Sequence, residues 1–570
     1  MSKIWKQVVS IFAICLLFTQ TIFGSISVLA ETNGGAQPIL NIIMTTDGQP
    51  YKEGDIATSP VTIQVTTSSA DSASIQLELS KDKGDSWEEL DSVTLLVLAE
   101  EGDYHLWFRI KGQPAISKHH VRIVPQLAVL AVSHPIYVNA ASTGSNDGTS
   151  WGDAFKDLQL ALNAAQTGDE IWIAAGTYTP TKRIFTNDPR SATFQMKNGV
   201  AIYGGFQGTE TKFTERNVQA NPTILDGLGD IYHVFYHPNG LKLDSSAVLD
   251  GLTITGGNAN GSMEHAYGGG MYNWSSSPRV TNVTFSENKA NIGGGIYNDY
   301  VSSPTITNVV FSENEADTGG GMHNNNYSSP TITNVVFNKN EVSHAGGGMY
   351  NYQKSSPTLT SVTFSGNKAH AGGGMFNDNA SNPTLTSVTF SVNKANAGGG
   401  MYNWSSSPSI TNVTFNRNEV TADGGGMFNY NSSPSLMNVE FSDNTASYGG
   451  VLYNINSSPT LTNVTISGNQ SMGTKGAIFG GNSQSKIQNS IIVGNHNEPA
   501  LSNYTGAIAN SLLDVEENGT VLAKLHNTKS DVETDTYKLE ALFIDPSQSD
   551  YRLRANSPAI NKGNNSDNTI

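Results

Sequence analysis

The stretch GGGMYN, residues 268–273, recurs along the chain and decides the predicted fold. Every copy ends in an asparagine, and the eight positions are Asn273, Asn298, Asn324, Asn351, Asn377, Asn403, Asn429 and Asn454. The steps between them are 25, 26, 27, 26, 26, 26 and 25 residues, so one unit is about 26 residues long. A glycine-rich loop that binds phosphate would occur once per site, whereas a series at a fixed period predicts a repeated architecture.

A second phrase recurs within each unit and first reads SSPRVTNVTFSEN, residues 276–288. We expect Val280, Val283 and Phe285 to point into the core. The step of three between the two valines breaks strand alternation, so Thr281-Asn282 should form a two-residue corner, and asparagine tolerates the left-handed conformation that such a corner needs. Three short strands fit one unit, which predicts an all-β, three-sheet solenoid with about 26 residues per coil.

Stacked coils place equivalent residues about 4.8 Å apart, which predicts ladders of hydrogen-bonded asparagine side chains. The corner ladder comprises Asn282, Asn308, Asn334, Asn412, Asn438 and Asn463, with interruptions at Ser361 and Ser387. The second ladder comprises Asn288, Asn314, Asn340, Asn367, Asn393, Asn418, Asn444 and Asn469. The charged residues that follow it, such as Lys289 and Glu315, should form an exposed charge ladder.

Residues 136–180 predict an N-terminal helix that caps the open end of the solenoid. Asp153 is the predicted N-cap, and Gly168 should end the helix. The apolar residues at helical spacing are Phe155, Leu158, Leu162 and Ala165. Such a helix would cover a core and a sheet edge that would otherwise be open to solvent.

Three resemblances extend this interpretation over residues 136–570. The stretches FQMKNGVAIYGGFQGTE (194–210) and PTILDG (222–227) resemble the opening segment of secreted right-handed parallel β-helix proteins with the pectin-lyase fold. The F-x-x-N and GG-aliphatic pairing is similar to the repeats of polymorphic outer-membrane proteins. LFIDPSQSDYRLRANSPAINKGNN (542–565) resembles the closing segment of the choice-of-anchor Q family. Together they imply a right-handed parallel β-helix on an exported protein.

The predicted domain organisation has four parts. Residues 1–30 have lysines ahead of an apolar run and a small-residue end, the pattern of a cleaved signal peptide. Residues 31–133 alternate in short runs and resemble an immunoglobulin-like β-sandwich that acts as a spacer. Residues 134–530 form the β-helix, with regular repeats at 268–469, and residues 531–570 form the choice-of-anchor Q-like segment.

Composition limits the partners and the compartment. The formal charge of −17 makes nucleic acid an unlikely partner, so none is expected. The single cysteine, Cys15, lies inside the predicted signal, so the mature chain should form no disulfide. No transmembrane segment is expected after the signal. These features predict a secreted, extracellular or cell-wall-associated protein, and we expect a monomer.

The residue before each repeat asparagine offers a candidate binding surface. It forms a column predicted to face outward: Tyr272, Tyr297, His323, Tyr350, Phe376, Tyr402, Phe428 and Tyr453. With Trp274 and Trp404 beside it, this column could stack on sugar rings. The alternative, which we favour, is a structural column that stabilises adjacent coils.

The irregular coils at 222–267 offer candidate catalytic or metal-binding residues. Asp226 and Asp250 both stand in L-D-G, 24 residues apart, so they could lie on neighbouring coils at a spacing suited to Ca²⁺ or to acid/base catalysis. His233 and His237 lie between them. The alternative is that aspartate before glycine simply forms a turn. No cofactor is expected, except Ca²⁺ if the protein is a lyase.

Two functions remain open. The favoured one is a non-catalytic surface protein whose β-helix is a rigid stalk, an adhesin or a platform that binds a polysaccharide or a host or cell-surface glycan. The other is a polysaccharide lyase or glycoside hydrolase with its site near coils 222–267. Whether the protein is an enzyme is therefore not decided by the sequence, which favours a non-catalytic role because fold does not imply function.

Overall fold

A computed structural model describes residues 135–447, 450–473, 476–495 and 500–517 continuously, with shorter segments between 26 and 123 and between 520 and 557. The chain divides into two compact units, residues 1–133 and 134–570. Each unit is described by itself. Most of the predicted signal peptide lies outside the described residues, and residues 26–28 of it form a strand.

The first unit consists of two sheets whose strands pair mainly antiparallel. One sheet has the order β1-β2-β5-β8 with β3 paired to β2, and the other has the order β4-β10-β9-β6-β7. The immunoglobulin-like topology expected for residues 31–133 stays a prediction. The strands are β1 (Ile26–Val28), β2 (Ile39–Thr46), β3 (Gln49–Pro50), β4 (Ile56–Ala57), β5 (Val61–Ser68), β6 (Leu77–Ser80), β7 (Glu88–Leu90), β8 (Thr94–Leu98), β9 (Gly102–Ile110) and β10 (Ser117–Ile123).

A helix covers the first coil of the second unit, as expected, but it begins later than the sequence suggested. Helix α2 (Leu158–Ala164) buries Leu158 and Leu162 in the main core. Its N-cap is Asp157, whose side chain accepts from the Gln159 amide at 2.8 Å, so the prediction of Asp153 is wrong. Asp153 instead accepts hydrogen bonds from Ser145 and Ser150 in the preceding loop, which leaves its carboxylate engaged before the helix begins.

The helix also ends earlier than predicted. Its last intrahelical bond runs from the amide of Ala165 to the carbonyl of Ala161. Gly168, at φ 99°, lies in the turn that follows. The strands of the irregular coils come next: β11 (Ile136–Val138, ahead of the helix), β12 (Glu170–Ala174), β13 (Gly176–Tyr178), β14 (Ala201–Phe206), β15 (Thr223–Ile231), β16 (Phe235–His237), β17 (Val248–Asp250) and β18 (Thr253–Ala259).

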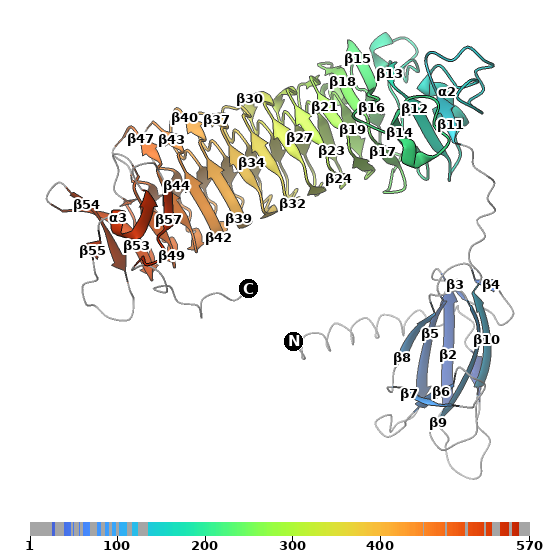
Figure 1. Cartoon of the computed structure of the whole chain (residues 1–570), viewed down its shortest axis with the longest axis horizontal. Helices are drawn as coiled ribbons and strands as arrows, with labels where there is room; N and C mark the ends of the chain where they lie inside the picture. Colours follow the sequence, from blue (N-terminus) through green and yellow to red (C-terminus); the bar gives the residue numbers. More distant parts are fainter. Residues whose placement is uncertain are drawn as a thin grey trace. The chain divides into compact units, whose positions relative to one another are not determined.

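Each regular coil contributes three or four short strands, where three were expected, and the strands pair in parallel with their counterparts in the next coil (Figure 1). In the first regular coil they are β19 (Met271–Trp274), β20 (Arg279–Thr281), β21 (Thr284–Ser286) and β22 (Lys289–Ala290). In the next they are β23 (Ile296–Asp299), β24 (Thr305–Thr307), β25 (Val310–Ser312) and β26 (Glu315–Thr318). This stacking is a parallel β-helix, and the predicted fold is confirmed.

The left-handed position of the predicted corner is confirmed in every regular coil, but the corner has one residue rather than two, because Thr281 stays in β20. Asn282 has φ 51°, and the same left-handed value recurs at Asn308 and Asn334. Serine takes over at Ser361 and Ser387, both with φ 55°. The asparagine side chains form the expected ladder, in which Asn308 Nδ2 donates to Asn282 Oδ1 at 3.1 Å. A single left-handed residue thus turns the chain from β20 into β21 without a loop.

The core is a set of apolar columns that run along the coils. Phe364 is fully buried, and its ring stacks on Phe337 at 4.7 Å and on Phe390 at 4.8 Å between centroids. Val280, Val283 and Phe285 are buried as predicted. Because every coil presents the same side chain at the same place, neighbouring coils pack like against like.

Two buried asparagine ladders flank this core. In the predicted one, Asn314 Nδ2 donates to Asn340 Oδ1 at 2.9 Å and to the carbonyl of Phe285 at 2.9 Å. The second was not predicted and uses the asparagines that end GGGMYN: Asn273 Nδ2 donates to Asn298 Oδ1 at 2.9 Å, and the series continues to Asn454. Each buried side-chain amide is hydrogen-bonded to the equivalent amide of the next coil, which offsets the free-energy cost of taking it out of water.

The exposed charge ladder is also present. Lys289 pairs with Glu315 at 2.8 Å, and Lys368 pairs with Glu341 at 2.5 Å, with all four side chains more than half exposed. Beyond the regular coils, β53 (Ser511–Glu517) and β54 (Thr520–His526) pair antiparallel, and α3 (Leu539–Leu542), β56 (Phe543–Asp545) and β57 (Asp550–Leu553) follow. Residues 558–570 lie outside the described part, and the choice-of-anchor Q resemblance stays a prediction.

Candidate functional site

The aromatic column lies on the sheet that begins with β16 and β19. Register places Tyr272 beside Tyr297, and Tyr350 beside Phe376, whose rings stack at 5.1 Å with planes 2° apart. The strands that carry the column are β19, β23, β27 (Met322–Asn324), β31 (Met349–Asn351), β34 (Met375–Asp378), β38 (Met401–Trp404), β41 (Met427–Tyr430) and β44 (Leu452–Ile455). The column is thus continuous from coil to coil.

This column is not an open stripe. Tyr272 is 1% exposed and Tyr402 is 9% exposed, while Tyr350 and Phe428 are half-buried. The rings cover one another, and Tyr236 and the half-buried Tyr267 and Trp274 pack against the first of them. Its hydroxyls turn to protein partners as well, since Tyr350 donates to Asp378 at 3.2 Å. The column therefore leaves little ring surface for a sugar, and its structural role, the alternative favoured from the sequence, stays a prediction.

Further aromatic rings, three of them exposed and three half-buried, lie two to four residues after the column residue of their coil, at strand ends or in the turns that follow. We call them the aromatic ridge: Trp274, Tyr300, Tyr327, Tyr352, Trp404 and Tyr430. Trp404 is 46% exposed and its ring lies 5.0 Å from that of Tyr430. Trp274 stacks on Tyr300 at 4.3 Å with planes 14° apart, and Tyr300 is 48% exposed. The sequence indicated the two tryptophans but missed the tyrosines, because the tyrosine position is not repeated in every coil.

Two carboxylates lie within the ridge. Asp299 is in register with Trp274, and Asp378 is in register with Trp404. Asp299 is 5% exposed and accepts from Asn326 Nδ2 at 2.7 Å and from Tyr297 at 3.2 Å. Burial raises the pKa of Asp299 above its ordinary range, although these hydrogen bonds oppose the shift. Burial likewise raises the pKa of Asp378. The ridge therefore combines flat rings with hydrogen-bonding groups.

The structure separates Asp226 from Asp250, which corrects the expected pairing. Asp226 is in register with Thr255, whereas Asp250 is in register with Tyr203 and Thr281. The two L-D-G motifs occupy different strand positions in their coils, so the identical sequence does not place the two aspartates side by side. Asp226 accepts from the Leu228 amide at 2.7 Å, as a turn residue does.

Asp250 has structural partners of its own. Its carboxylate accepts a hydrogen bond from Arg216, whose side chain is 7% exposed, in a charge-assisted ion pair. The same carboxylate accepts from Asn282 Nδ2 at 3.0 Å. Because Asn282 is the first asparagine of the corner ladder, Asp250 terminates that ladder on the N-terminal side.

The two histidine candidates are buried. His237 Nδ1 bonds to Asn273 Oδ1 at 2.7 Å, and burial lowers the pKa of His237 to about 4. His237 therefore starts the buried ladder that follows. His233 Nδ1 lies 3.0 Å from the carbonyl of Gly268, and burial lowers the pKa of His233 to about 3. Both rings are neutral at pH 7, and neither faces Asp226 or Asp250 in any hydrogen bond of the described residues.

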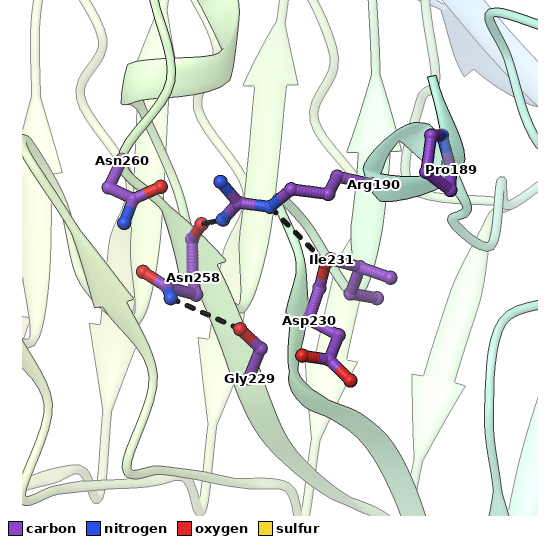
Figure 2. Close-up of a pocket in the computed structure, with 7 residues that line it drawn as sticks. All are labelled: Pro189, Arg190, Gly229, Asp230, Ile231, Asn258 and Asn260. Carbon is purple, nitrogen blue, oxygen red and sulfur yellow. Dashed lines mark hydrogen bonds between the residues drawn. The ribbon is translucent and has the colours of Figure 1, made fainter. Parts of the chain in front are cut away.

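An open hollow of about 430 Å³ lies beside these coils (Figure 2). Arg190 crosses it, and its guanidinium donates to the carbonyls of Asp230 at 3.2 Å and Asn258 at 2.7 Å while lying 4.3 Å over the Tyr232 ring. Among the described residues, the side chain of Asp230 has no hydrogen-bond partner. The lining residues are Pro189, Arg190, Gly229, Asp230, Ile231, Asn258 and Asn260.

A metal site does not emerge in the part of the chain that the structure describes. No group of three or more histidine, cysteine, aspartate or glutamate side chains there is arranged to hold an ion. With Asp226 and Asp250 apart, a Ca²⁺ site built on both is not supported by the register. No helix among the described residues is long and apolar enough to cross a membrane.

Comparison with known families agrees with the geometry. Residues 331–449 match the family model described as right handed beta helix region. Residues 282–299 match the repeat of the Chlamydia polymorphic membrane protein. No curated protein and no solved structure matches the chain significantly. The chain is thus a right-handed parallel β-helix repeat protein whose repeats resemble those of polymorphic outer-membrane proteins.

Proposed function

We propose that the protein is a secreted or cell-surface β-helix rod that binds an extended glycan along the aromatic ridge. The observation that carries this proposal is two pairs of aromatic rings on one edge of the solenoid, each with one exposed member: Tyr300 stacked on Trp274, and Trp404 tilted against Tyr430. Exposed tryptophan and tyrosine rings are costly to leave in water and suit the apolar faces of sugar rings.

The spacing of the ridge supports a polymer rather than a single sugar. Trp274 and Trp404 are separated by five coil steps along β19, β23, β27, β31, β34 and β38, or about 24 Å at about 4.8 Å per coil. Tyr352 and Asp378, both half-buried, lie on the coils between them. A glycan chain lying along the axis would meet rings at both ends and hydrogen-bonding groups in the middle.

An outer-surface location suits this role. The repeat at residues 282–299 resembles that of a membrane protein family, and the N-terminal sequence has the pattern of a secretory signal. The acidic charge of the chain favours neutral glycans, because an acidic polymer would be repelled. No catalytic step is part of this proposal.

The test is glycan binding by single-site variants. Trp404→Ala should weaken binding to a neutral polysaccharide about five- to tenfold, because a stacking ring is worth about 1–1.5 kcal/mol and about 1.4 kcal/mol is a factor of ten. Val392→Ala is the matched control, since Val392 is also 46% exposed but lies outside the ridge. Affinity electrophoresis in gels that contain neutral or acidic polysaccharides measures the binding of both variants and of wild type. Equal binding by wild type and Trp404→Ala would rule out the ridge.

A second function, polysaccharide cleavage, is favoured only by the hollow beside coils 222–267 and by the solvent-facing carboxylate of Asp230. An enzyme would release unsaturated or reducing ends from a polysaccharide. If Asp230→Asn or Asp226→Asn abolished this release and Trp404→Ala did not, the protein would be a polysaccharide-cleaving enzyme and the binding proposal would be wrong. Adding EDTA to the assay shows whether Ca²⁺ takes part.

A further inference from the structure

A second regular surface lies on the strands that follow the aromatic ridge in each coil. The sequence T-x-T, or its serine variant, recurs on β24, β28 (Thr331–Thr333), β32 (Thr358–Thr360), β35 (Thr384–Thr386) and the start of β39 (Ser409–Asn416). Register pairs the first residues with one another and the third residues with one another. We call this surface the threonine lattice: Thr305, Thr307, Thr331, Thr333, Thr358, Thr360, Thr384, Thr386, Ser409 and Thr411.

The hydroxyl groups of the threonine lattice are left to solvent. The middle residue of each strand, such as Ile306 or Leu359, is fully buried, so the two flanking side chains must point outward. Among the described residues, none of the ten hydroxyls has a hydrogen-bond partner in the protein. This contrasts with the neighbouring serine row, where the Ser303 amide bonds to Ser277 Oγ at 2.9 Å.

The lattice is uncharged although the protein is strongly charged elsewhere. In its two columns the nearest charged side chains lie beyond the ends of the lattice: Arg279 is one coil before Thr305, and Lys486 is three coils after Ser409. The charges of the regular coils instead lie on other edges, as in the pair Lys289 and Glu315. Each threonine of the lattice therefore offers one methyl and one hydroxyl group, and Ser409 offers a hydroxyl group alone.

The spacings of the lattice are set by the backbone. Coils repeat at about 4.8 Å, and the two columns lie about 6.6 Å apart, which is twice the rise per residue. Because β-branched side chains are stiff at χ1, equivalent threonines adopt the same orientation in every coil. The result is a regular two-dimensional array of hydroxyl and methyl groups with these two spacings.

We propose that the threonine lattice binds ice. A solid made only of water presents neither charge nor aromatic stacking, and the lattice offers neither. Its hydroxyls can take water positions while its methyls exclude the disordered water between the two surfaces. Binding through many weak, regularly spaced contacts needs a rigid and periodic partner, which the stacked coils provide. This proposal rests on different residues from the glycan ridge.

Two measurements on the purified protein test the lattice. The first is the fraction of protein incorporated into slowly growing ice, and the second is thermal hysteresis. Wild type should enter the ice and depress the freezing point below the melting point. Thr358→Tyr, at the middle of the lattice, should reduce both effects severalfold, because a ring lifts the whole face from the flat ice surface.

The matched control is Thr363→Tyr, which lies in the same coil but beyond the Ser361 corner, on β33 (Thr363–Ser365). It should leave both effects close to wild type, and circular dichroism checks that both variants keep their strands. Absence of any ice effect in wild type would overturn the proposal, as would equal losses in both variants. Lattice-dependent dimers, or lattice-dependent binding to crystalline cellulose without an ice effect, would also overturn it by showing another occupant.

Discussion

The regular coils, residues 268–469, and the irregular coils before them satisfy their buried polar groups in different ways. In the regular coils an asparagine bonds to its own counterpart one coil away, as Asn298 does with Asn324 at 2.9 Å. In the irregular coils the partners differ in kind, as in Arg216 with Asp250. In the regular coils, one pairing of identical asparagines satisfies the buried polar groups of every coil. In the irregular coils, a buried polar group such as that of Asp250 needs a partner of a different residue type.

The largest effect should come from the apolar stack of the regular coils. Phe364→Ala removes a fully buried ring between Phe337 and Phe390 and leaves a cavity, so unfolding should become easier by about 3–5 kcal/mol. Chemical denaturation measures it. A loss no larger than that of an exposed control such as Val392→Ala would contradict the like-on-like packing of the coils.

Next in size is the buried ion pair of the irregular coils. Arg216→Ala leaves the carboxylate of Asp250, whose side chain is only 16% exposed, without its cation, and the cost should be about 3 kcal/mol. The double variant Arg216→Ala with Asp250→Ala should recover part of that loss. If the double variant is no more stable than Arg216→Ala, the lost stability belongs to packing of the arginine rather than to the charge.

A pH-dependent effect distinguishes the one histidine of the aromatic column. His323 is 5% exposed and stacks on Tyr350, and burial lowers its pKa to about 3. Since the unfolded histidine takes up a proton near pH 6.5, His323 costs stability as the pH falls from about 6.5 toward 3. His323→Phe should therefore gain on wild type by about 1.4 kcal/mol per pH unit in that window. A constant difference between pH 7 and pH 4 would contradict this.

The smallest effect should come from the exposed ion pair of the regular coils. Lys368 and Glu341 are 60% and 56% exposed, and Lys368→Ala should change stability by less than about 1 kcal/mol, and less still at high salt. The loss of stability in this variant can be compared directly with the loss in Arg216→Ala, which breaks an ion pair of the irregular coils. A loss as large as that of Arg216→Ala would show that the charge ladder, too, supports the fold.

The structure of the regular coils was predictable from the sequence because a correct assignment of one repeat unit applies to all the others. The step from Val280 to Val283 was enough to place the corner at Asn282, and both asparagine columns named in advance form ladders. The outward direction of the Tyr272 column was also right, since Met271 beside it is in the core. Its burial was not predictable from alternation, because it depends on rings from neighbouring coils and on Tyr267 and Trp274.

The irregular coils were predictable only in outline. The capping helix was expected, but two aspartates, at 153 and 157, could each have capped it, and only the loop contacts of Asp153 decide between them. Asp226 and Asp250 share the wording L-D-G, yet a coil of unequal length moved them to different strands. The role of His237 as the first member of a ladder could have been found by counting back from Asn273, since β16 aligns the two.

The asparagine ladders make the length of the rod adjustable in whole steps. Deleting residues 346–371 would remove one complete coil and bring Asn324 beside Asn377, the same kind of neighbour that it has now in Asn351. The rod would shorten by about 4.8 Å, and the asparagine ladders would keep the same kind of contact. Duplication of the corresponding stretch of the gene would lengthen the rod by the same amount. The length of this protein can therefore change in evolution by whole coils while the pattern of its surface residues is kept.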